Sequence, residues 1–231
     1  MTNKETVLEK FKIHKQNVQK KINNCVNFLN GRAGAHDLSK EQEPELSMFI
    51  KSSQVLDNVK YGSDEYNKSI DDMKKEALGH HYLVNRHHPE HYKDGISGMS
   101  IIDIMEMMCD WAAASEQYGT DIQESVETSI KRFHIAGTPM ENIIRNSVPY
   151  FYNYGIRIIY PDGTSKNLCS NDYDELLGMV KSLPMTISSS LIKLITDPMS
   201  SDGMLDLLIL PIEEDEKSSF TEIHFIKNQN N

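Results

Sequence analysis

The chain has 231 residues, of which 39% are hydrophobic and 25% charged, and this is the composition of a folded globular protein with a substantial core. Its formal net charge of −10 at pH 7 argues against a generally basic surface for duplex nucleic acid, although a local basic pocket is compatible with it. Cys25, Cys109 and Cys169 are odd in number and widely spaced, which argues against a disulfide framework and a thiolate zinc site.

No targeting or membrane-spanning segment is expected. The first residues, Met-Thr-Asn-Lys-Glu, lack the apolar stretch of a signal peptide, and no run approaches eighteen apolar residues. Together with the cysteine pattern, this predicts a cytoplasmic protein that does not bind membranes.

The first predicted element is an amphipathic helix over residues 6–29, which the glycines at 31–34 are expected to end. His14 occupies an apolar step of this helix, so its ring is expected to point inward, either as a hydrogen-bonded core histidine or as a metal ligand. The early lysines are expected to form a solvated helix face. The apolar positions recur at steps of three and four residues: Val7, Phe11, Val18, Ile22, Cys25 or Val26, and Leu29.

Four further helices are predicted, at residues 44–59, 64–81, 101–114 and 120–133. A turn at 61–64 precedes the second of these, and Pro and Gly residues predict a loop over 85–98. Ser100 and Asp103 have the spacing of a capping box at the start of the predicted helix 101–114. In the predicted helix 44–59, the side chains expected to face inward are Leu46, Phe49, Ile50 and Leu56.

The pattern changes after about residue 137. Residues 156–160 and 164–168 flank Pro161-Asp162-Gly163 and predict a β-hairpin. A helix at 173–182 and strands at 205–212 and 220–226 are expected to follow. The predicted fold is therefore mainly α, with a helical bundle over residues 1–138 and a small α+β region over 139–231, whose polar tail at 227–231 is expected to be disordered.

Histidines and acids concentrate in the predicted bundle. Seven of the nine histidines lie between His36 and His134, and five lie within residues 80–91. Neutral His and ionised Asp are the usual ligands of Fe, Mn and Zn, so the concentration predicts a buried metal site. Adjacent His36 and Asp37 can serve one ion if both side chains point into a cleft.

The helix at 101–114 carries three acids on one face, at spacings of three and four residues. Asp110 lies among apolar neighbours, so its carboxylate requires a metal ion or an arginine as a counter-charge. Asp103 has an alternative role as a first-turn acid that the helix dipole favours. Glu106 is either a partner of the site or a surface charge.

Not every histidine of the run at 80–91 is expected to be a ligand. His91 lies in a turn and is expected to be exposed, and His80 faces away from His81 on a helix. His87 and His88 are expected to diverge as adjacent side chains, so one of them is expected to lie outside the ligand shell.

The order of these residues resembles that of the HD superfamily of metal-dependent phosphohydrolases, whose ligands follow a His, His-Asp, Asp order on a helical bundle. The segment His36-Asp37-Leu38-Ser39-Lys40 looks like the His-Asp-x-x-Lys motif of that superfamily. Residues 87–98 and the later Asp110 are similar to the HD-GYP branch, but the Gly-Tyr-Pro element is absent, so specificity for cyclic dinucleotides is not implied. A His-His-Pro-Glu pattern also resembles a group of uncharacterised bacterial and phage proteins. The resemblance covers about residues 7–135.

The resemblance implies a ligand set and a chemistry. A first ion would be held by His14, His36, Asp37 and Asp110, with Asp37 able to bridge to a second ion, and His81, His87 and His88 would supply that second site or act on the leaving group. Catalytic roles fall on Asp37, His81 and His87, and Lys40 and Arg86 either hold phosphate oxygens or are ordinary solvated cations. The implied cofactor is one or two ions of Mn, Fe, Co, Zn or Mg.

The leading expectation is therefore a metal-dependent phosphohydrolase that acts on a nucleotide or related phosphoester, with no duplex nucleic acid as partner and with homo-oligomerisation left open. A di-iron oxygenase on the same scaffold and a non-catalytic binding protein are the alternatives. The H-E-x-x-H motif, a Walker-type phosphate loop, G-x-G-x-x-G and G-x-S-x-G are absent from the sequence.

Overall fold

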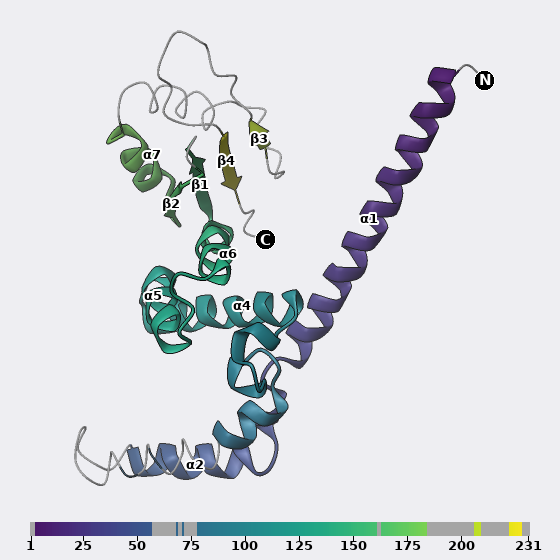
Figure 1. The fold of residues 1–231 in the computed structure, drawn as a ribbon. Coiled ribbons are helices and arrows are strands. Elements are labelled where there is room, and N and C mark those ends of the chain that lie inside the picture. The colour runs from purple at the N-terminus through teal and green to yellow at the C-terminus, as the bar shows by residue number, and fades with distance from the viewer. Residues whose placement is uncertain are drawn as a thin grey trace. The chain divides into compact units, whose positions relative to one another are not determined.

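The computed structural model of the chain describes residues 3–56, 68, 71, 78–160, 163–183, 206–208 and 222–227 (Figure 1). The chain forms two compact units, Met1–Asp110 and Trp111–Asn231, with the boundary inside helix α4 (Ile101–Tyr118). The division after residue 138 that the sequence suggests stays a prediction. Helices dominate the described residues, and a small antiparallel sheet lies near the C-terminus, which confirms the predicted fold class.

The first unit begins with α1 (Asn3–Ala35), which Figure 1 draws as one uninterrupted helix. The expectation that residues 31–34 end it is wrong, because glycine in a helix costs only about 1 kcal/mol relative to alanine and does not forbid helical dihedrals. Residues 3–28 are exposed throughout, and no residue of α1 is buried. The expected inward orientation of the apolar stripe and of His14 is therefore wrong.

The predicted second helix is confirmed as α2 (Glu45–Leu56), but its orientation differs from the prediction. Leu46 and Ile50, expected inward, are exposed, and Phe49 is half-buried. Among the described side chains of α2, Glu45 is the one that is completely buried. The turn at 61–64, most of the predicted third helix and the side chain of Leu56 lie outside the described residues, although residues 78–84 are helical.

The predicted loop over 85–98 is confirmed, and it contains the short 3-10 turns η2 (Pro89–His91) and η3 (Gly95–Gly98). At the start of α4, Ser100 Oγ donates to Asp103 Oδ2 at 2.6 Å and the Asp103 N–H donates to Ser100 Oγ at 3.3 Å, which confirms the capping box. Met107 is buried on α4, whereas Cys109 is exposed. The helix is thus amphipathic, not buried on all sides.

The second unit contains helices and a four-stranded sheet. The strands are antiparallel in the order β2-β1-β4-β3, and β1 pairs with β2 in the register Ile156↔Leu168, so the predicted hairpin is confirmed. The core between sheet and helix contains Ile156, Ile158, Leu168, Leu176 and Val180. The elements are α5 (Ile122–Arg132), α6 (Pro139–Ser147), η4 (Val148–Phe151), β1 (Tyr154–Ile159), β2 (Ser165–Ser170), α7 (Tyr173–Lys181), β3 (Asp206–Leu208) and β4 (Glu222–Lys227).

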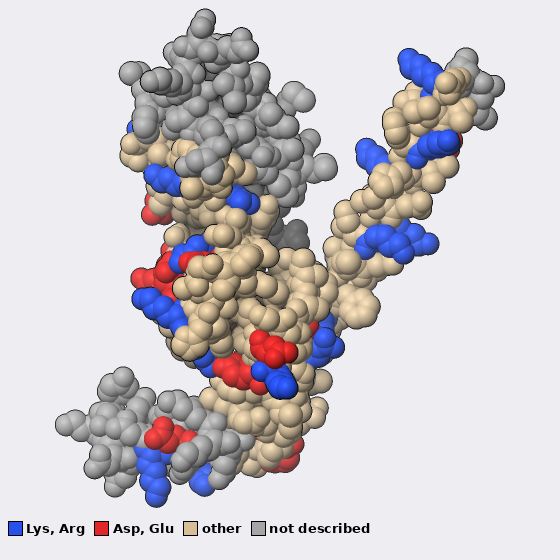
Figure 2. Space-filling view, in the orientation of Figure 1, with Lys and Arg blue, Asp and Glu red and all other residues tan. Residues whose placement is uncertain are grey.

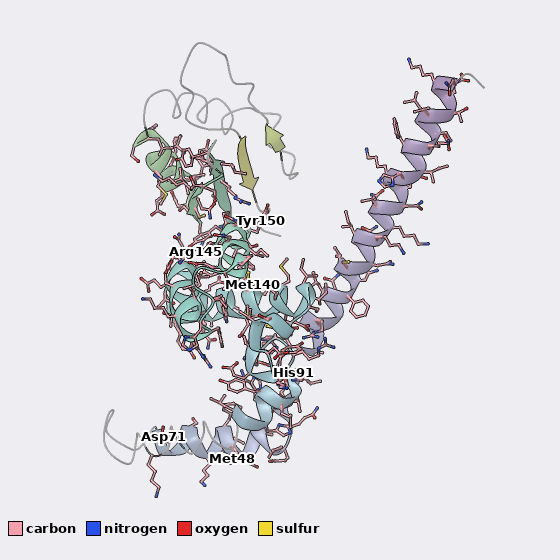
Figure 3. The ribbon with its side chains drawn as sticks, in the orientation of Figure 1. Met48, Asp71, His91, Met140, Arg145 and Tyr150 are labelled. Atoms are coloured by element: carbon pink, nitrogen blue, oxygen red, sulfur yellow. The ribbon has the colours of Figure 1, made fainter. Side chains whose placement is uncertain are left out.

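Helix α6 and the 3-10 turn η4 are elements of the described second unit that the sequence pattern did not predict. Arg145, labelled in Figure 3, joins α6 to α5 through an ion pair with Glu127, and its Nε donates to Glu141 at 2.8 Å. The predicted strands at 205–212 and 220–226 correspond to β3 and β4, and residues 228–231 of the predicted disordered tail lie outside the described residues. No helix within the described ranges combines the length and the apolar character needed to cross a membrane.

Replacing Asp103 by Asn is expected to destabilise the protein in a pH-dependent way. Burial alone would raise the pKa of Asp103, but hydrogen bonds from Ser100 outweigh burial and lower it to about 2. A depressed carboxyl pKa stabilises the folded state above the unfolded-state pKa, and this stabilisation is lost as the pH falls toward the folded-state pKa. We expect a loss of about 2 kcal/mol in the free energy of unfolding near neutral pH, shrinking as the pH falls from about 4 to about 2.

Denaturant unfolding at a series of pH values measures this difference. Asp94→Asn is the matched control, because Asp94 is exposed and should show no pH-dependent difference from the wild type. A loss for Asp103→Asn that is the same at every pH would contradict the prediction.

Candidate metal centre

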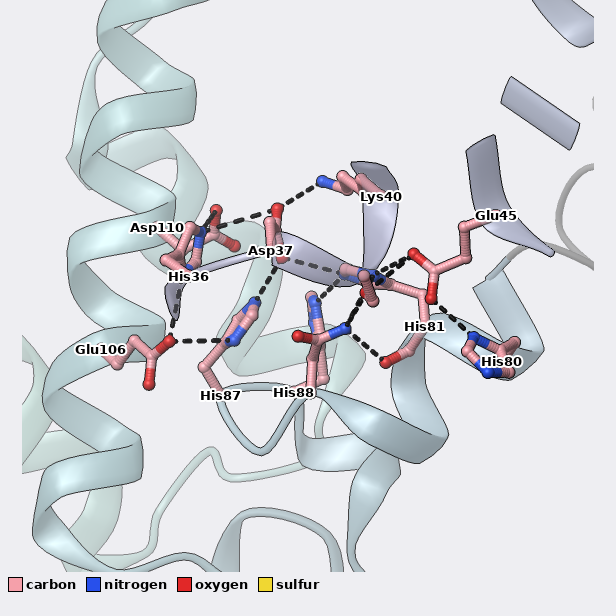
Figure 4. A network of polar contacts seen from close by, with 12 residues as sticks. His36, Asp37, Lys40, Glu45, His80, His81, His87, His88, Glu106 and Asp110 are labelled. Atoms are coloured by element: carbon pink, nitrogen blue, oxygen red, sulfur yellow. Dashed lines mark hydrogen bonds and ion pairs between the residues drawn. The ribbon is translucent and has the colours of Figure 1, made fainter. Parts of the chain in front are cut away.

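The end of α1 leads directly into a cluster of titratable side chains. His36 and Asp37 follow Ala35, and Asp37 has a left-handed backbone conformation with φ 54° and ψ 17°. Aspartate tolerates this conformation better than most residues, and such backbone outliers gather at functional sites. The resulting turn lets two adjacent side chains reach one centre, as Figure 4 shows.

Later segments of the first unit bring further donors to Asp37. The Nε2 atoms of His81 and His87 lie 3.2 and 3.4 Å from Asp37 Oδ1. His36 Nε2 lies 3.6 Å from Asp37 Oδ2 and 3.5 Å from Asp110 Oδ1. The added side chains are His81 from the helical residues 78–84, His87 and His88 from the following loop, and Asp110 from α4.

These donors form two overlapping groups, in each of which one ligand atom per residue lies within 4.8 Å of all the others. Asp37 and His87 belong to both groups, so the two positions are neighbours. Each group can hold a metal ion. The first group is Asp37, His81, His87 and His88, and the second is His36, Asp37, His87 and Asp110.

Two carboxylates behind the histidines orient the rings. His36 Nδ1 donates to Glu106 Oε1 at 3.0 Å, and His87 Nδ1 lies 3.3 Å from the same oxygen. His81 Nδ1 donates to the buried Glu45 at 2.9 Å. A carboxylate only accepts hydrogen bonds, so each Nδ1 carries a proton and each Nε2 faces the centre, where it offers a lone pair whenever the ring is neutral. Carboxylates play this part behind the histidines of metal sites.

Arg32, in the last turn of α1, holds Glu106 in place. Its Nε donates to Glu106 Oε2 at 2.6 Å, and its Nη1 donates to Asp103 Oδ1 at 3.2 Å. Because the guanidinium occupies Oε2, the other oxygen of Glu106 remains for the two imidazoles. This ion pair also joins the end of α1 to α4, the two elements that supply His36 and Asp110.

The spacing of the donors fits a coordination shell. Nitrogen ligands about 2.0–2.1 Å from an ion lie about 2.8–3.4 Å from their neighbours in octahedral or tetrahedral geometry, and the distances around Asp37 are close to the upper end of this range, at 3.2–3.6 Å. Asp37 Oδ1 and His87 Nε2 are buried and have no hydrogen-bond partner within the described residues. Unpaired buried acceptors destabilise a fold, and a cation between them would offset that cost.

The protonation of the histidines differs across the cluster. The hydrogen bond with Asp110 raises the pKa of His36 to about 9, although burial acts in the opposite direction. Burial, together with the neighbouring histidines, lowers the pKa of His88 to about 3. His88 is therefore neutral at pH 7, as a ligand must be, whereas an ion bound at His36 would displace a proton.

Asp37 is ionised in spite of its burial. Burial alone would raise the pKa of Asp37, but the neighbouring His81 and Lys40 side chains hold it well below its usual range. Lys40 Nζ donates to Asp37 Oδ2 at 2.5 Å from the half-exposed rim of the cluster. Lys40, one of the two cations predicted to hold a phosphate, thus lies beside the Asp37 carboxylate.

The structure brings together six of the seven residues that the sequence singled out as metal ligands: His36, Asp37, His81, His87, His88 and Asp110. His14 is the exception. It lies on the exposed part of α1, 22 residues before His36 on a continuous helix and so about 33 Å away along its axis. The ligand role that the resemblance implies for His14 does not fit this structure.

The expectation that His87 and His88 diverge is wrong. Their ring centroids lie 4.1 Å apart, and both belong to the first donor group. Residues 85–88 form neither helix nor strand, so the divergence of neighbours in regular elements does not apply. His80 and His91 lie outside both groups, as expected, although His91 is half-buried and donates to the Tyr82 carbonyl.

Arg86 is not brought into the cluster. Its guanidinium donates to Asp103 at 3.2 Å and to the Tyr92 hydroxyl at 3.3 Å, and the side chain is otherwise exposed. It therefore supports Asp103 on the side opposite Arg32. A direct contact of Arg86 with a phosphate stays a prediction.

The sequence did not identify Glu45 or Arg32 as parts of the site and left Glu106 open. Glu45 follows Pro44 at a helix start, where an acid is routine, and Arg32 lies between two glycines that predicted a break. The expected metal-binding histidines could have indicated such acids, because an imidazole that keeps one lone pair for an ion needs a hydrogen-bond acceptor on its other nitrogen. Which acid supplies it depends on tertiary structure.

Comparison with known proteins places the chain in a family. A family model described as "Family of unknown function (DUF5662)" matches residues 3–150, so the chain belongs to this family. The match includes all of the donor residues. No curated protein and no solved structure matched the chain.

Replacing Glu45 or Glu106 by Gln is expected to weaken the two ion positions unequally. Among the donor residues Glu45 contacts only His81, while its other oxygen accepts from His80 outside both groups, so Glu45→Gln should lower the affinity of the first group by about 10–100-fold. Glu106 supports His36 and His87, so Glu106→Gln should weaken both groups. Titration of metal-free protein with Co²⁺, followed by visible absorption and calorimetry, resolves the two steps.

Glu116→Gln on the exposed end of α4 is the matched control and should leave both affinities unchanged. Equal losses from Glu45→Gln and Glu106→Gln, or no loss from either, would show that these carboxylates do not orient the ligands as described.

Proposed function

We propose that the chain is a metal-dependent phosphohydrolase that acts on a nucleotide or another small phosphorylated compound. One observation carries the proposal: a single half-buried carboxylate, Asp37, is shared by two adjacent groups of donors and is also contacted by Lys40. Shared carboxylates between neighbouring ions are typical of phosphoryl-transfer sites.

The donor set supports this chemistry. Imidazoles and carboxylates are borderline and hard ligands, suited to Mn, Fe, Co or Zn more than to ions that prefer thiolates. Ions bound in such pairs stabilise charge on a phosphoryl oxygen and lower the pKa of a bound water. The His36-Asp37-x-x-Lys40 segment that resembles the HD superfamily motif lies at the centre of the cluster, whereas the implied ligand His14 does not.

The chain's own groups take distinct parts in the proposed reaction. Asp37 holds the two donor groups together, and Lys40 at the rim is placed to bind a phosphate oxygen when its contact with Asp37 is exchanged for one with substrate. His81 and His87, each backed by a carboxylate, are fixed in one tautomer and orientation. His36, which holds a proton in the ion-free cluster, is the group that exchanges this proton for an ion.

The same donors are compatible with oxygen chemistry at a di-iron centre, because His and carboxylate ligands around a shared Asp also suit iron. A binding protein that retains the ions without turnover is the third alternative. Purified protein incubated with Mn²⁺, Co²⁺ or Mg²⁺ and a panel of nucleotides separates the three. Phosphate release supports the proposal, and oxygen consumption with iron but no phosphate release would replace it by the oxygenase.

Asp37→Asn is expected to lower phosphate release by on the order of 10³-fold or more, because several kcal/mol of charge stabilisation is lost. Asp94→Asn, an equally conservative change of an exposed acid, should leave the rate unchanged. Circular dichroism of both variants checks that the fold is retained. Unchanged turnover of folded Asp37→Asn, or turnover that withstands complete chelation, would refute the proposal.

A further inference from the structure

Helix α1 exposes an unusual amount of apolar surface. Isolated helices are marginal in water without tertiary packing, yet none of the residues of α1 is buried. Contiguous apolar patches of this kind mark interaction surfaces. The large apolar side chains that are at least 40% exposed on α1 are Val7, Leu8, Phe11, Ile13, Val18, Ile22, Val26 and Phe28.

Four of them belong to a regular stripe, here called the α1 seam, which consists of Leu8, Phe11, Lys15, Val18, Ile22, Cys25 and Leu29. Successive members are separated alternately by three and four residues, an average of 3.5. Such a heptad repeat keeps the same face toward one neighbouring helix and is the pattern of coiled coils. Lys15 is the single charged member, and its long apolar stem can lie along the seam while the ammonium group reaches water.

The positions that flank the seam do not oppose the approach of an identical helix in parallel orientation. The helix carries seven Lys and Arg against two Glu, and Figure 2 shows blue side chains among uncharged ones on its visible face. In a parallel pair, the positions beside the seam would meet as Val7 with Lys12, His14 with Gln19, Lys21 with Val26, and Phe28 with Ala33. None of these pairs sets two ionised side chains against each other.

The seam is also long enough for a dimer. From residue 8 to residue 29 the helix rises about 32 Å, and a cylinder of that length and about 10 Å diameter has a lateral surface of roughly 1,000 Å². Covering half of it on each of two helices buries about 1,000 Å² in total, which is at the lower limit for a specific interface. A second copy of the chain offers a matching seam by symmetry.

We propose that the α1 seam pairs with the α1 seam of a second copy of this chain, so that the protein is a homodimer joined by a two-helix coiled coil. The modest area makes the dimer dependent on protein concentration. The net positive charge of each helix opposes pairing, so added salt strengthens the dimer by screening that repulsion. Neither the metal site nor catalysis is needed for this pairing.

Sedimentation velocity of the full chain over a range of concentrations tests the proposal. Ile22→Glu introduces a charge into the seam and is expected to weaken dimerisation by at least about tenfold. Ile13→Glu is the matched control: Ile13 is also exposed, at 48% against 57% for Ile22, but it lies two residues from both Phe11 and Lys15 and so off the seam. It should leave the dimer unchanged, and circular dichroism verifies that both variants remain helical.

Three results would overturn the proposal. The first is a wild type that stays monomeric at all concentrations up to about 100 μM, because a dimer weaker than this has too low an affinity for a specific interface. The second is an equal effect of Ile13→Glu and Ile22→Glu on dimerisation. Association that weakens when the ionic strength rises from about 0.05 to about 0.5 M would indicate that α1 binds an acidic surface of another copy of the chain instead of a second α1.

Discussion

The crowding of donor atoms around Asp37 is the constraint on which the candidate site depends. Glu45 accepts a hydrogen bond from Nδ1 of His81, Glu106 accepts one from Nδ1 of His36, and Nδ1 of His87 lies 3.3 Å from Glu106, so the Nε2 atoms of these rings face one another and the Asp37 carboxylate. Donors held this close, with two buried atoms that have no hydrogen-bond partner among the described residues, form a favourable arrangement only around positive charge. A proton on His36 supplies part of that charge in the ion-free protein, and one or two metal ions would supply more.

A second layer of ion pairs maintains this arrangement. Arg32 connects the last turn of α1 to Glu106 and Asp103 on α4, and Arg86 contacts Asp103 from the loop. Asp103 also closes the capping box at the start of α4. The groups that position the ligands are therefore the same groups that join the end of α1, the loop and α4, so local fold and site are stabilised together. This is why a conservative change at Glu106 is a sharper probe than removal of a ligand.

The sequence predicted much of this and failed for physical reasons that can be named. Periodicity and turn residues were sufficient for α4, α5 and the β1–β2 hairpin, because local interactions determine these elements. The apolar stripe of α1 was interpreted as a core face, but periodicity shows only that a face is apolar and not what covers it. His14 lies on the same stripe, so its predicted inward orientation was wrong for the same reason. His87 and His88 were correctly predicted in a loop, but the divergence of neighbouring side chains, which holds in regular elements, was wrongly applied to them. Glu45 and Arg32 were not predicted as parts of the site because their contacts within the site join segments that are distant in the sequence.

Anomalous X-ray diffraction from crystals grown with Mn²⁺ or Zn²⁺ tests the central claim most directly. The structure predicts one or two anomalous peaks about 2.0–2.3 Å from Asp37 and from the Nε2 atoms of the surrounding histidines, with Glu106 and Glu45 retained on the opposite ring nitrogens. Crystals that bind no ion at this position, with Asp37 and His87 satisfied by ordered water or by each other, would contradict the account.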